Sequence, residues 1–133
     1  MQAALKIVDQ TTSGEAIGEF RLELVSDRVT VREVIERRVR HEVEAFNAKA
    51  ELGLFRGLVE PTDAERVLNG GIRLKKRRRL DPEKQVAAAL KGFATNGFFM
   101  LAEGRQLESL DEELFVTGEA LVTFVKLVPL VGG

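Results

Sequence analysis

The last two residues of the sequence, Gly132 and Gly133, are the ones whose chemistry is easiest to predict. Glycine has no Cβ, so a glycine pair can pass down a narrow channel in which any larger residue would clash. A carboxylate on Gly133 could then reach a reactive centre at the end of that channel. We therefore expect Gly132 and Gly133 to be a site at which the chain is activated.

The residues just before the glycines are mostly apolar, and together with the glycines they form residues 127–133, which we call the diglycine segment. Because the proline ring fixes φ, Pro129 should hold part of this segment extended. Its neighbours are too apolar for a peptide that contacts only water. We expect the enzyme that activates Gly133 to bind the side chains of Leu127, Val128, Pro129, Leu130 and Val131.

The elements before the diglycine segment must position it. Residues 98–108 are predicted to form a strand, a turn and a short strand, because apolar residues flank a glycine. Residues 110–114 should form one helical turn and residues 118–120 a second turn. The apolar residues 122–131 are then predicted to form the last strand of a sheet.

This order of elements resembles the C-terminal half of the ubiquitin family. Residues 104–108, Gly-Arg-Gln-Leu-Glu, stand where ubiquitin carries a glycine-lysine-glutamine-leucine-glutamate turn. The diglycine segment is closer to the prokaryotic sulfur carriers of the same β-grasp family, which often carry a proline a few residues before the glycines. The resemblance implies an α+β, β-grasp domain over residues 1–133. It also implies that a partner, the activating enzyme, uses ATP to adenylate the carboxylate of the last glycine.

The first part of the sequence predicts a β-hairpin followed by a long helix. Residues 5–7 open one strand, 11–14 offer turn residues, and 20–25 alternate between apolar and polar types. Thr30 and Glu33 have the spacing of a capping box. Apolar residues then recur three or four apart over about five turns of helix. In a β-grasp domain this helix would cross a mixed sheet.

The side chains that we expect in the core come from this helix and from the later strands. They are Val34, Ile35, Val39, Leu101 and Phe124.

Residues 52–97 depart from a small ubiquitin-like domain, and we expect them to form a helical insertion before the C-terminal strands. Residues 61–65 contain another capping box and predict a short helix that closes at the glycines of 69–71. Residues 81–83, Asp-Pro-Glu, predict the start of a second helix, which should end at 96–97. The resemblance covers only the two ends of the chain, so it implies no role for this insertion.

A basic run within the insertion has several interpretations. Clustered cations can bind a phosphate backbone, but no aromatic residues interleave to stack on bases, and the net charge of the chain is −1. The run also alternates as a strand would, with charges that would guard an exposed sheet edge. We favour the solvated or edge-guarding interpretation over nucleic-acid binding, and an acidic protein partner is a third alternative. The candidate anion-binding residues are Lys75, Lys76, Arg77, Arg78 and Arg79.

The composition, 44% hydrophobic and 31% charged, is that of an ordinary globular domain. The sequence contains no cysteine and a single histidine, so it cannot carry a thioester or a thiolate metal site itself. It also lacks the usual catalytic motifs, and we expect no enzymatic activity, no metal and no bound cofactor. Without a leader or an apolar run of the roughly 20 residues that span a bilayer, the expected location is the cytoplasm.

The sequence therefore predicts a ubiquitin-like protein modifier whose Gly133 carboxylate is activated and joined to amines of target proteins. Its partners would be an activating enzyme, a conjugating enzyme, an isopeptidase and the targets. A sulfur carrier that forms a thiocarboxylate at Gly133 is the first alternative. We rank it second because 104–108 match ubiquitin and because a minimal carrier would not need the insertion. A non-covalent adaptor that uses the basic run is the other alternative.

Overall fold

The computed structural model describes residues 3–48, 54–55, 64–66, 72–74 and 80–127. The architecture is α+β, with a mixed five-stranded sheet among the strands and two helices, α1 (Val31–Ala48) and α2 (Pro82–Ala94). The chain divides into two compact units. The first contains residues 1–34 and 92–133, and the second contains residues 35–91.

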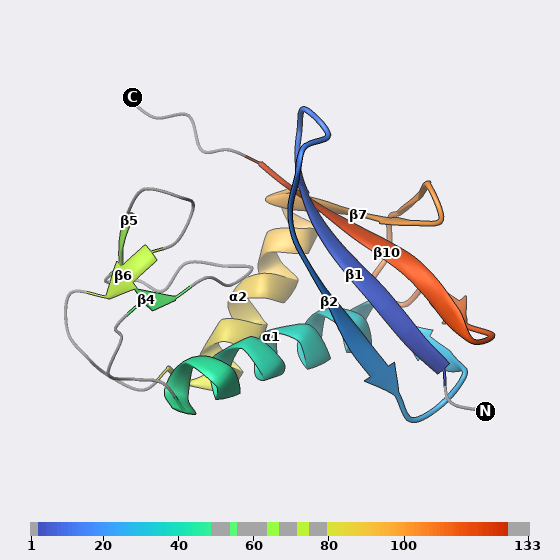
Figure 1. The fold of residues 1–133 in the computed structure, drawn as a ribbon, viewed down its shortest axis with the longest axis horizontal. Coiled ribbons are helices and arrows are strands. Elements are labelled where there is room, and N and C mark those ends of the chain that lie inside the picture. Colours follow the sequence, from blue (N-terminus) through green and yellow to red (C-terminus); the bar gives the residue numbers. More distant parts are fainter. Residues whose placement is uncertain (1–2, 49–53, 56–63, 67–71, 75–79, 128–133) are drawn as a thin grey trace. The chain divides into compact units, whose positions relative to one another are not determined.

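The five-stranded sheet belongs to the first unit, and its strand order is β2-β1-β10-β7-β8 (Figure 1). The first and last strands of the chain pair in parallel at its centre, and every other pairing is antiparallel. The central strand β10 therefore has hydrogen-bonded neighbours on both sides. The bounds of the strands are Ala3–Thr11 for β1, Ala16–Leu24 for β2, Phe98–Ala102 for β7, Arg105–Leu107 for β8 and Glu119–Lys126 for β10.

Two hairpins flank the central pair, and both were predicted. The turn after β1 is closed by the N–H of Gly14, which donates to the carbonyl of Thr11, with φ of 89° at Gly14. The turn between β7 and β8 has φ of 48° at Glu103 and 84° at Gly104. Positive φ at both central residues matches the twist of a two-residue hairpin loop.

One face of the sheet carries the buried side chains. Leu5, Ile7, Met100 and Phe124 are all fully buried on it. Their positions follow from the register, in which Met100 pairs with Phe124 and alternate residues share a face. This face supplies the apolar burial that stabilises the first unit.

Most of the predicted core is confirmed. Val34, Ile35, Val39 and Phe124 are at most 2% exposed. The prediction for Leu101 is wrong, because it is only half-buried and pairs with Thr123 on the opposite face of the sheet.

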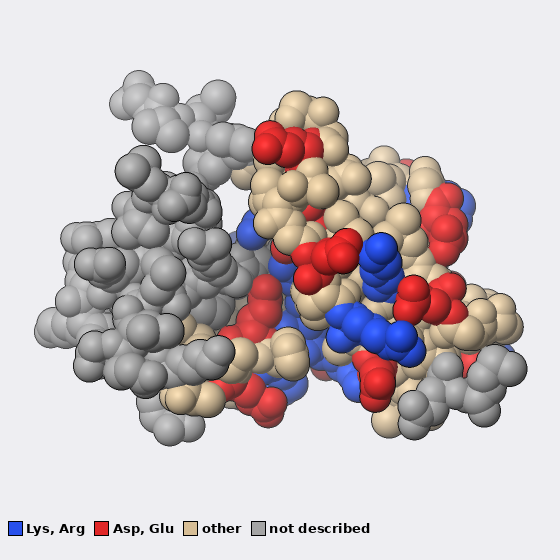
Figure 2. All heavy atoms as spheres, in the orientation of Figure 1, with Lys and Arg blue, Asp and Glu red and all other residues tan. Residues whose placement is uncertain are grey.

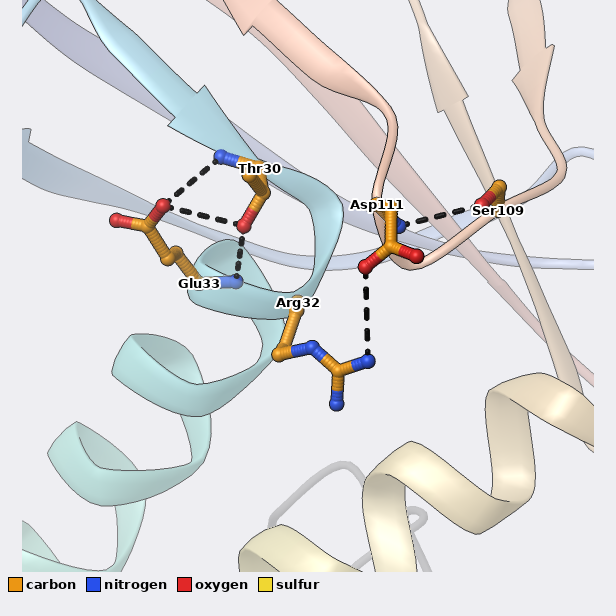
Figure 3. Close-up of polar contacts among 5 residues, drawn as sticks. All are labelled: Thr30, Arg32, Glu33, Ser109 and Asp111. Carbon is orange, nitrogen blue, oxygen red and sulfur yellow. Dashed lines mark hydrogen bonds and ion pairs between the residues drawn. The ribbon is translucent and has the colours of Figure 1, made fainter.

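The predicted capping box at the start of α1 is confirmed (Figure 3). The N–H of Glu33 donates to the Thr30 hydroxyl over 3.1 Å, and the N–H of Thr30 donates to the Glu33 carboxylate over 3.3 Å. Arg32 of the same turn forms an ion pair with Asp111 at 3.7 Å. The start of α1 is therefore held by contacts within its own first turn and by a loop that is distant in the sequence.

The prediction of a helical turn at 110–114 is wrong. A tight turn closes when the N–H of Glu112 donates to the carbonyl of Ser109, and strand β9 (Glu113–Phe115) follows. This strand pairs with β3 (Arg28–Thr30) in a separate two-stranded sheet. The carbonyls of Leu110 and Glu112 accept the first N–H groups of α1, which would otherwise lack partners. These long-range contacts hold the loop extended.

The insertion is not wholly helical, although helix α2 was predicted. Strands β4 (Leu54–Phe55), β6 (Ile72–Leu74) and β5 (Ala64–Arg66) form a three-stranded antiparallel sheet. The prediction of a helix that begins within 61–65 is therefore wrong for Ala64–Arg66, which form strand β5. A helix of so few residues leaves most of its backbone groups unpaired, whereas β5 pairs with β6.

Both predicted ends of α2 are confirmed. The Asp81 carboxylate accepts the N–H of Glu83 over 2.9 Å at the start. At the other end Asn96 has φ of 60°, and its N–H donates to the carbonyl of Phe93. The N–H of Gly97 donates to the carbonyl of Gly92 over 2.6 Å, which completes a Schellman motif.

Within the second unit Asn47 of α1 holds the backbone of Leu80, two residues before α2 begins. The side chain of Asn47 accepts the N–H of Leu80 over 2.8 Å and donates to the carbonyl of Leu80 over 3.1 Å. Leu80 is only 3% exposed, so water cannot easily replace these bonds. Arg40 also forms an ion pair with Glu83 at 2.7 Å, and this hydrogen-bonded carboxylate raises the pKa of Arg40.

Replacing Asn47 with alanine should destabilise the second unit by about 1–3 kcal/mol, because two buried backbone groups of Leu80 lose their partners. Chemical denaturation followed by far-UV circular dichroism measures the change. Glu44→Ala, at an exposed position of the same helix, should change stability by less than about 0.5 kcal/mol. Equal effects of the two substitutions would contradict the role given to Asn47.

Candidate functional site

The diglycine segment follows directly from β10, the central strand of the sheet. Lys126, the last residue of β10, is paired with Thr11 of β1 on one side and with Phe98 of β7 on the other. Leu127 comes next and is 40% exposed. A strand held on both sides thus fixes the point from which residues 127–133 depart.

Of the predicted site residues, only Leu127 belongs to the described part of the chain, and its exposure leaves it accessible to a partner. The other predicted residues lie outside the described ranges. They are Val128, Pro129, Leu130, Val131, Gly132 and Gly133 of the diglycine segment, and Lys75, Lys76, Arg77, Arg78 and Arg79 of the basic run.

Aromatic side chains anchor the end of β10 beneath this exit point. Phe124 is fully buried, and its ring lies 5.9 Å from that of Phe98 in a tilted arrangement. The ring of Phe98 lies a further 6.1 Å from that of Phe93. Tilted pairs at such separations are favourable beyond the area that they bury. These contacts pack Phe124 into the core two residues before the end of β10.

The opposite face of β7 and β10 carries an apolar surface, which we call the outer strip. The register places Phe99 beside Val125 and Leu101 beside Thr123. Leu121 extends the same face toward the start of β10 and is 37% exposed. The outer strip and Leu127 therefore offer apolar side chains on two neighbouring strands and on the residue that follows β10.

The sequence interpretation did not identify the outer strip as a surface. The signal was present in residues 98–101, Phe-Phe-Met-Leu, which do not alternate with polar residues. A strand that is apolar on both faces requires cover on both faces. Here one face is buried in the core, and the other carries Phe99 and Leu101, which are half-buried.

A small cavity of about 280 Å³ lies beside the same end of the sheet. Phe98 and Phe99 of β7 line it together with Gln106 and Glu108 from the far side of the β7–β8 hairpin. Because Phe98 pairs with Lys126, the cavity lies one strand away from the exit of the diglycine segment. It combines aromatic walls with a single carboxylate.

The charges over β1 and β2 are of mixed sign (Figure 2). Lys6 forms an ion pair with Glu19 at 3.7 Å, and Arg21 forms one with Glu119 at 3.2 Å. All four side chains are well exposed, so salt screens these pairs and each adds little stability. This face therefore lacks the uniform positive charge that would attract a nucleic acid.

Within the described ranges, no group of three or more acidic, histidine or cysteine side chains is placed to hold a metal ion. Neither helix of the described chain is both long enough and apolar enough to cross a membrane.

Comparison with known proteins found no matching family model, no matching curated protein and no matching solved structure.

Proposed function

We propose that the chain is a ubiquitin-like β-grasp protein that acts as a protein modifier. Its Gly133 carboxylate is adenylated by an activating enzyme at the expense of ATP and is then joined to an amine of a target protein. The chain itself performs no catalysis and binds no cofactor. Leu127 and the apolar residues 128–131 dock on the activating enzyme while Gly132 and Gly133 enter its active site.

The observation that carries the proposal is the order of strands in the five-stranded sheet. In the β-grasp fold the first and last strands pair in parallel at the centre, and a hairpin strand lies outside each of them. The order β2-β1-β10-β7-β8 has this arrangement.

The position of the diglycine segment supports the same proposal. It follows the central strand in the sequence, and the end of that strand is paired with β1 and with β7. An activating enzyme that binds the end of β10 has the carboxylate within the reach of the seven residues 127–133. The active-site channel of that enzyme must then position the carboxylate, because a misplacement of about 1 Å can lower the rate roughly a hundredfold.

The proposal is tested by looking for the product on target lysines. Trypsin cleaves after Lys126, so a modified lysine should carry the remnant Leu-Val-Pro-Leu-Val-Gly-Gly from residues 127–133. The chain ending at Gly133 is incubated with ATP and an extract of its source cells, and tryptic peptides are analysed by mass spectrometry. We expect ATP-dependent lysines that carry this remnant.

The same experiment distinguishes the sulfur carrier. A carrier would yield no lysine remnant but would exchange an oxygen for sulfur at the Gly133 carboxylate, which intact mass spectrometry detects. If neither product forms in an extract that does activate other carboxylates, both the modifier and the sulfur-carrier forms of the proposal are contradicted.

The basic run should not be needed for activation. Neutralising Arg77, Arg78 and Arg79 is expected to leave adenylation of Gly133 unchanged, because a solvated or edge-guarding run acts only by repulsion. The rate of ATP–pyrophosphate exchange measures this. Tight RNA binding by the intact chain that weakens steeply with salt, with a slope reduced by about three counterions in the variant, would favour the adaptor instead.

A further inference from the structure

A second cavity, which we call the end cavity, lies at the other end of the sheet, where β10 begins. Its volume is about 350 Å³, at the lower end of the range of ligand sites, roughly 300–1,000 Å³. Leu5 and Val122 of the sheet and Val116 after β9 form its floor and are at most 1% exposed. Ala102 and Ala120 also line it and are partly exposed, so they lie nearer its mouth.

The chemistry of the lining favours binding over catalysis. The described residues that line the cavity include no hydroxyl, thiol or imidazole group. The floor is aliphatic, and the polar groups at the rim are charged side chains. A site of this kind gains free energy by removing an apolar group from water. An aliphatic side chain of a partner would do so.

An aromatic side chain extends the apolar surface beyond the mouth. Phe115 of β9 lines the cavity yet is 69% exposed, an unusual position for a large apolar residue. The guanidinium of Arg28 lies 4.9 Å from the centre of its ring, and Arg28 also forms an ion pair with Glu113 at 3.2 Å. These contacts hold the Phe115 ring at the rim.

The charged side chains at the rim of the end cavity indicate which kind of residue should lie beside a bound aliphatic side chain. Arg105 forms an ion pair with Glu112, and Glu113 forms one with Arg28. The carboxylate of Glu103 accepts the N–H of Leu121 over 2.8 Å, but it joins none of the ion pairs found among the described residues. The rim therefore presents one negative charge that a cation could balance.

We propose that the end cavity binds an aliphatic side chain of a protein partner that carries a lysine or arginine directly beside it. The aliphatic group would enter between Ala102 and Ala120, and the cation would lie against Glu103. This interaction does not depend on the diglycine segment. Ala120 and Leu127 are seven residues apart along an extended strand, or about 23 Å. Both surfaces could be occupied at the same time.

The test uses two capped dipeptides, acetyl-leucyl-lysine amide and acetyl-leucyl-glutamate amide, titrated against the full chain with its methyl groups labelled for NMR. We expect saturable shifts of the methyl signals of Leu5, Leu114 and Val122, which line the cavity. The lysine peptide should bind about two- to fivefold more tightly, the range typical of one exposed ion pair. Absence of saturable shifts at these methyl groups, or shifts confined to the outer strip, would overturn the proposal.

Two variants make the test specific. Glu103→Gln keeps an oxygen that can accept the N–H of Leu121 but removes the charge, so the preference for the lysine peptide should disappear. Glu108→Gln, at an exposed position that does not line the end cavity, should keep the preference. Ala120→Leu should fill the cavity and weaken both peptides at least tenfold. If Ala120→Leu fails to fold, the comparison of Glu103→Gln with Glu108→Gln still tests the proposal. An unchanged preference of Glu103→Gln for the lysine peptide would refute a partner that carries a cation.

Discussion

Deleting Gly133 should lower the rate of ATP-dependent adenylation by more than about a hundredfold, because catalysis tolerates little misplacement of the reacting group. The deletion leaves a carboxylate on Gly132 that falls short by one residue, or about 3.5 Å of extended chain. Adding one glycine after Gly133 should have a similar effect, because it moves the carboxylate too far. ATP–pyrophosphate exchange with the activating enzyme measures both changes.

Both variants should fold as the parent does, since the change lies beyond β10 and its pairing with β1 and β7. Unchanged amide exchange in β10 would establish this. A second comparison separates the effect of the length of the diglycine segment from the effect of its width. Gly132→Ala keeps the length of the segment but adds a Cβ, and it should also slow adenylation if the glycines enter a narrow channel. Full activity of the Gly133 deletion would rule out both the modifier and the sulfur carrier.

The start of α1 could be predicted because its signals are local and agree with each other. Thr30 and Glu33 have the spacing of a capping box, and apolar residues then repeat with a helical period for the whole 18 residues of the helix. The same spacing at Thr62 and Glu65 was misleading. There the apolar period stops within a few residues at Gly70 and Gly71, so a helix could not recover the cost of its first turn.

The errors at Leu101 and at 110–114 have another origin. Residues 98–101 are apolar without alternation, so the sequence does not say which of them face the core. The pairing of Met100 with Phe124 decides it, and that pairing joins residues that are distant in the sequence. Strand β9 likewise depends on β3, which precedes it by more than 80 residues. No local pattern contains such information.

The candidate site was predicted in part for a related reason. The glycines and the proline of 127–133 are visible in the sequence, because their conformational properties belong to single residues. The outer strip and the end cavity are not visible in this way. Leu5, Val116 and Val122 come from separate segments and line one cavity only after the sheet and β9 have formed. The shape of a cavity and the charge at its rim depend on the tertiary structure, so local sequence patterns do not reveal them.

Replacing Phe124 with alanine should destabilise the first unit by about 3–5 kcal/mol, the usual cost of removing a buried aromatic side chain and leaving a cavity. Phe124 is fully buried in the central strand, and its ring lies 5.9 Å from that of Phe98. Such a loss is a large fraction of the total stability of a domain, which is typically only about 5–15 kcal/mol. The sequence contains no tryptophan or tyrosine, so far-UV circular dichroism and amide exchange in β1 and β10 are the suitable measurements.

The matched control is Phe115→Ala, which removes the same group from a ring that is 69% exposed. Phe115 loses mainly its contact with the guanidinium of Arg28, which is worth about 0.5–1 kcal/mol at an exposed site. The two substitutions should therefore differ by at least about 2 kcal/mol, which is the gap between these ranges. A loss below about 0.5 kcal/mol for Phe124→Ala, the size expected at a surface position, would mean that the faces of β10 are assigned the wrong way round. The diglycine segment would then leave the sheet from a strand that its aromatic contacts do not anchor.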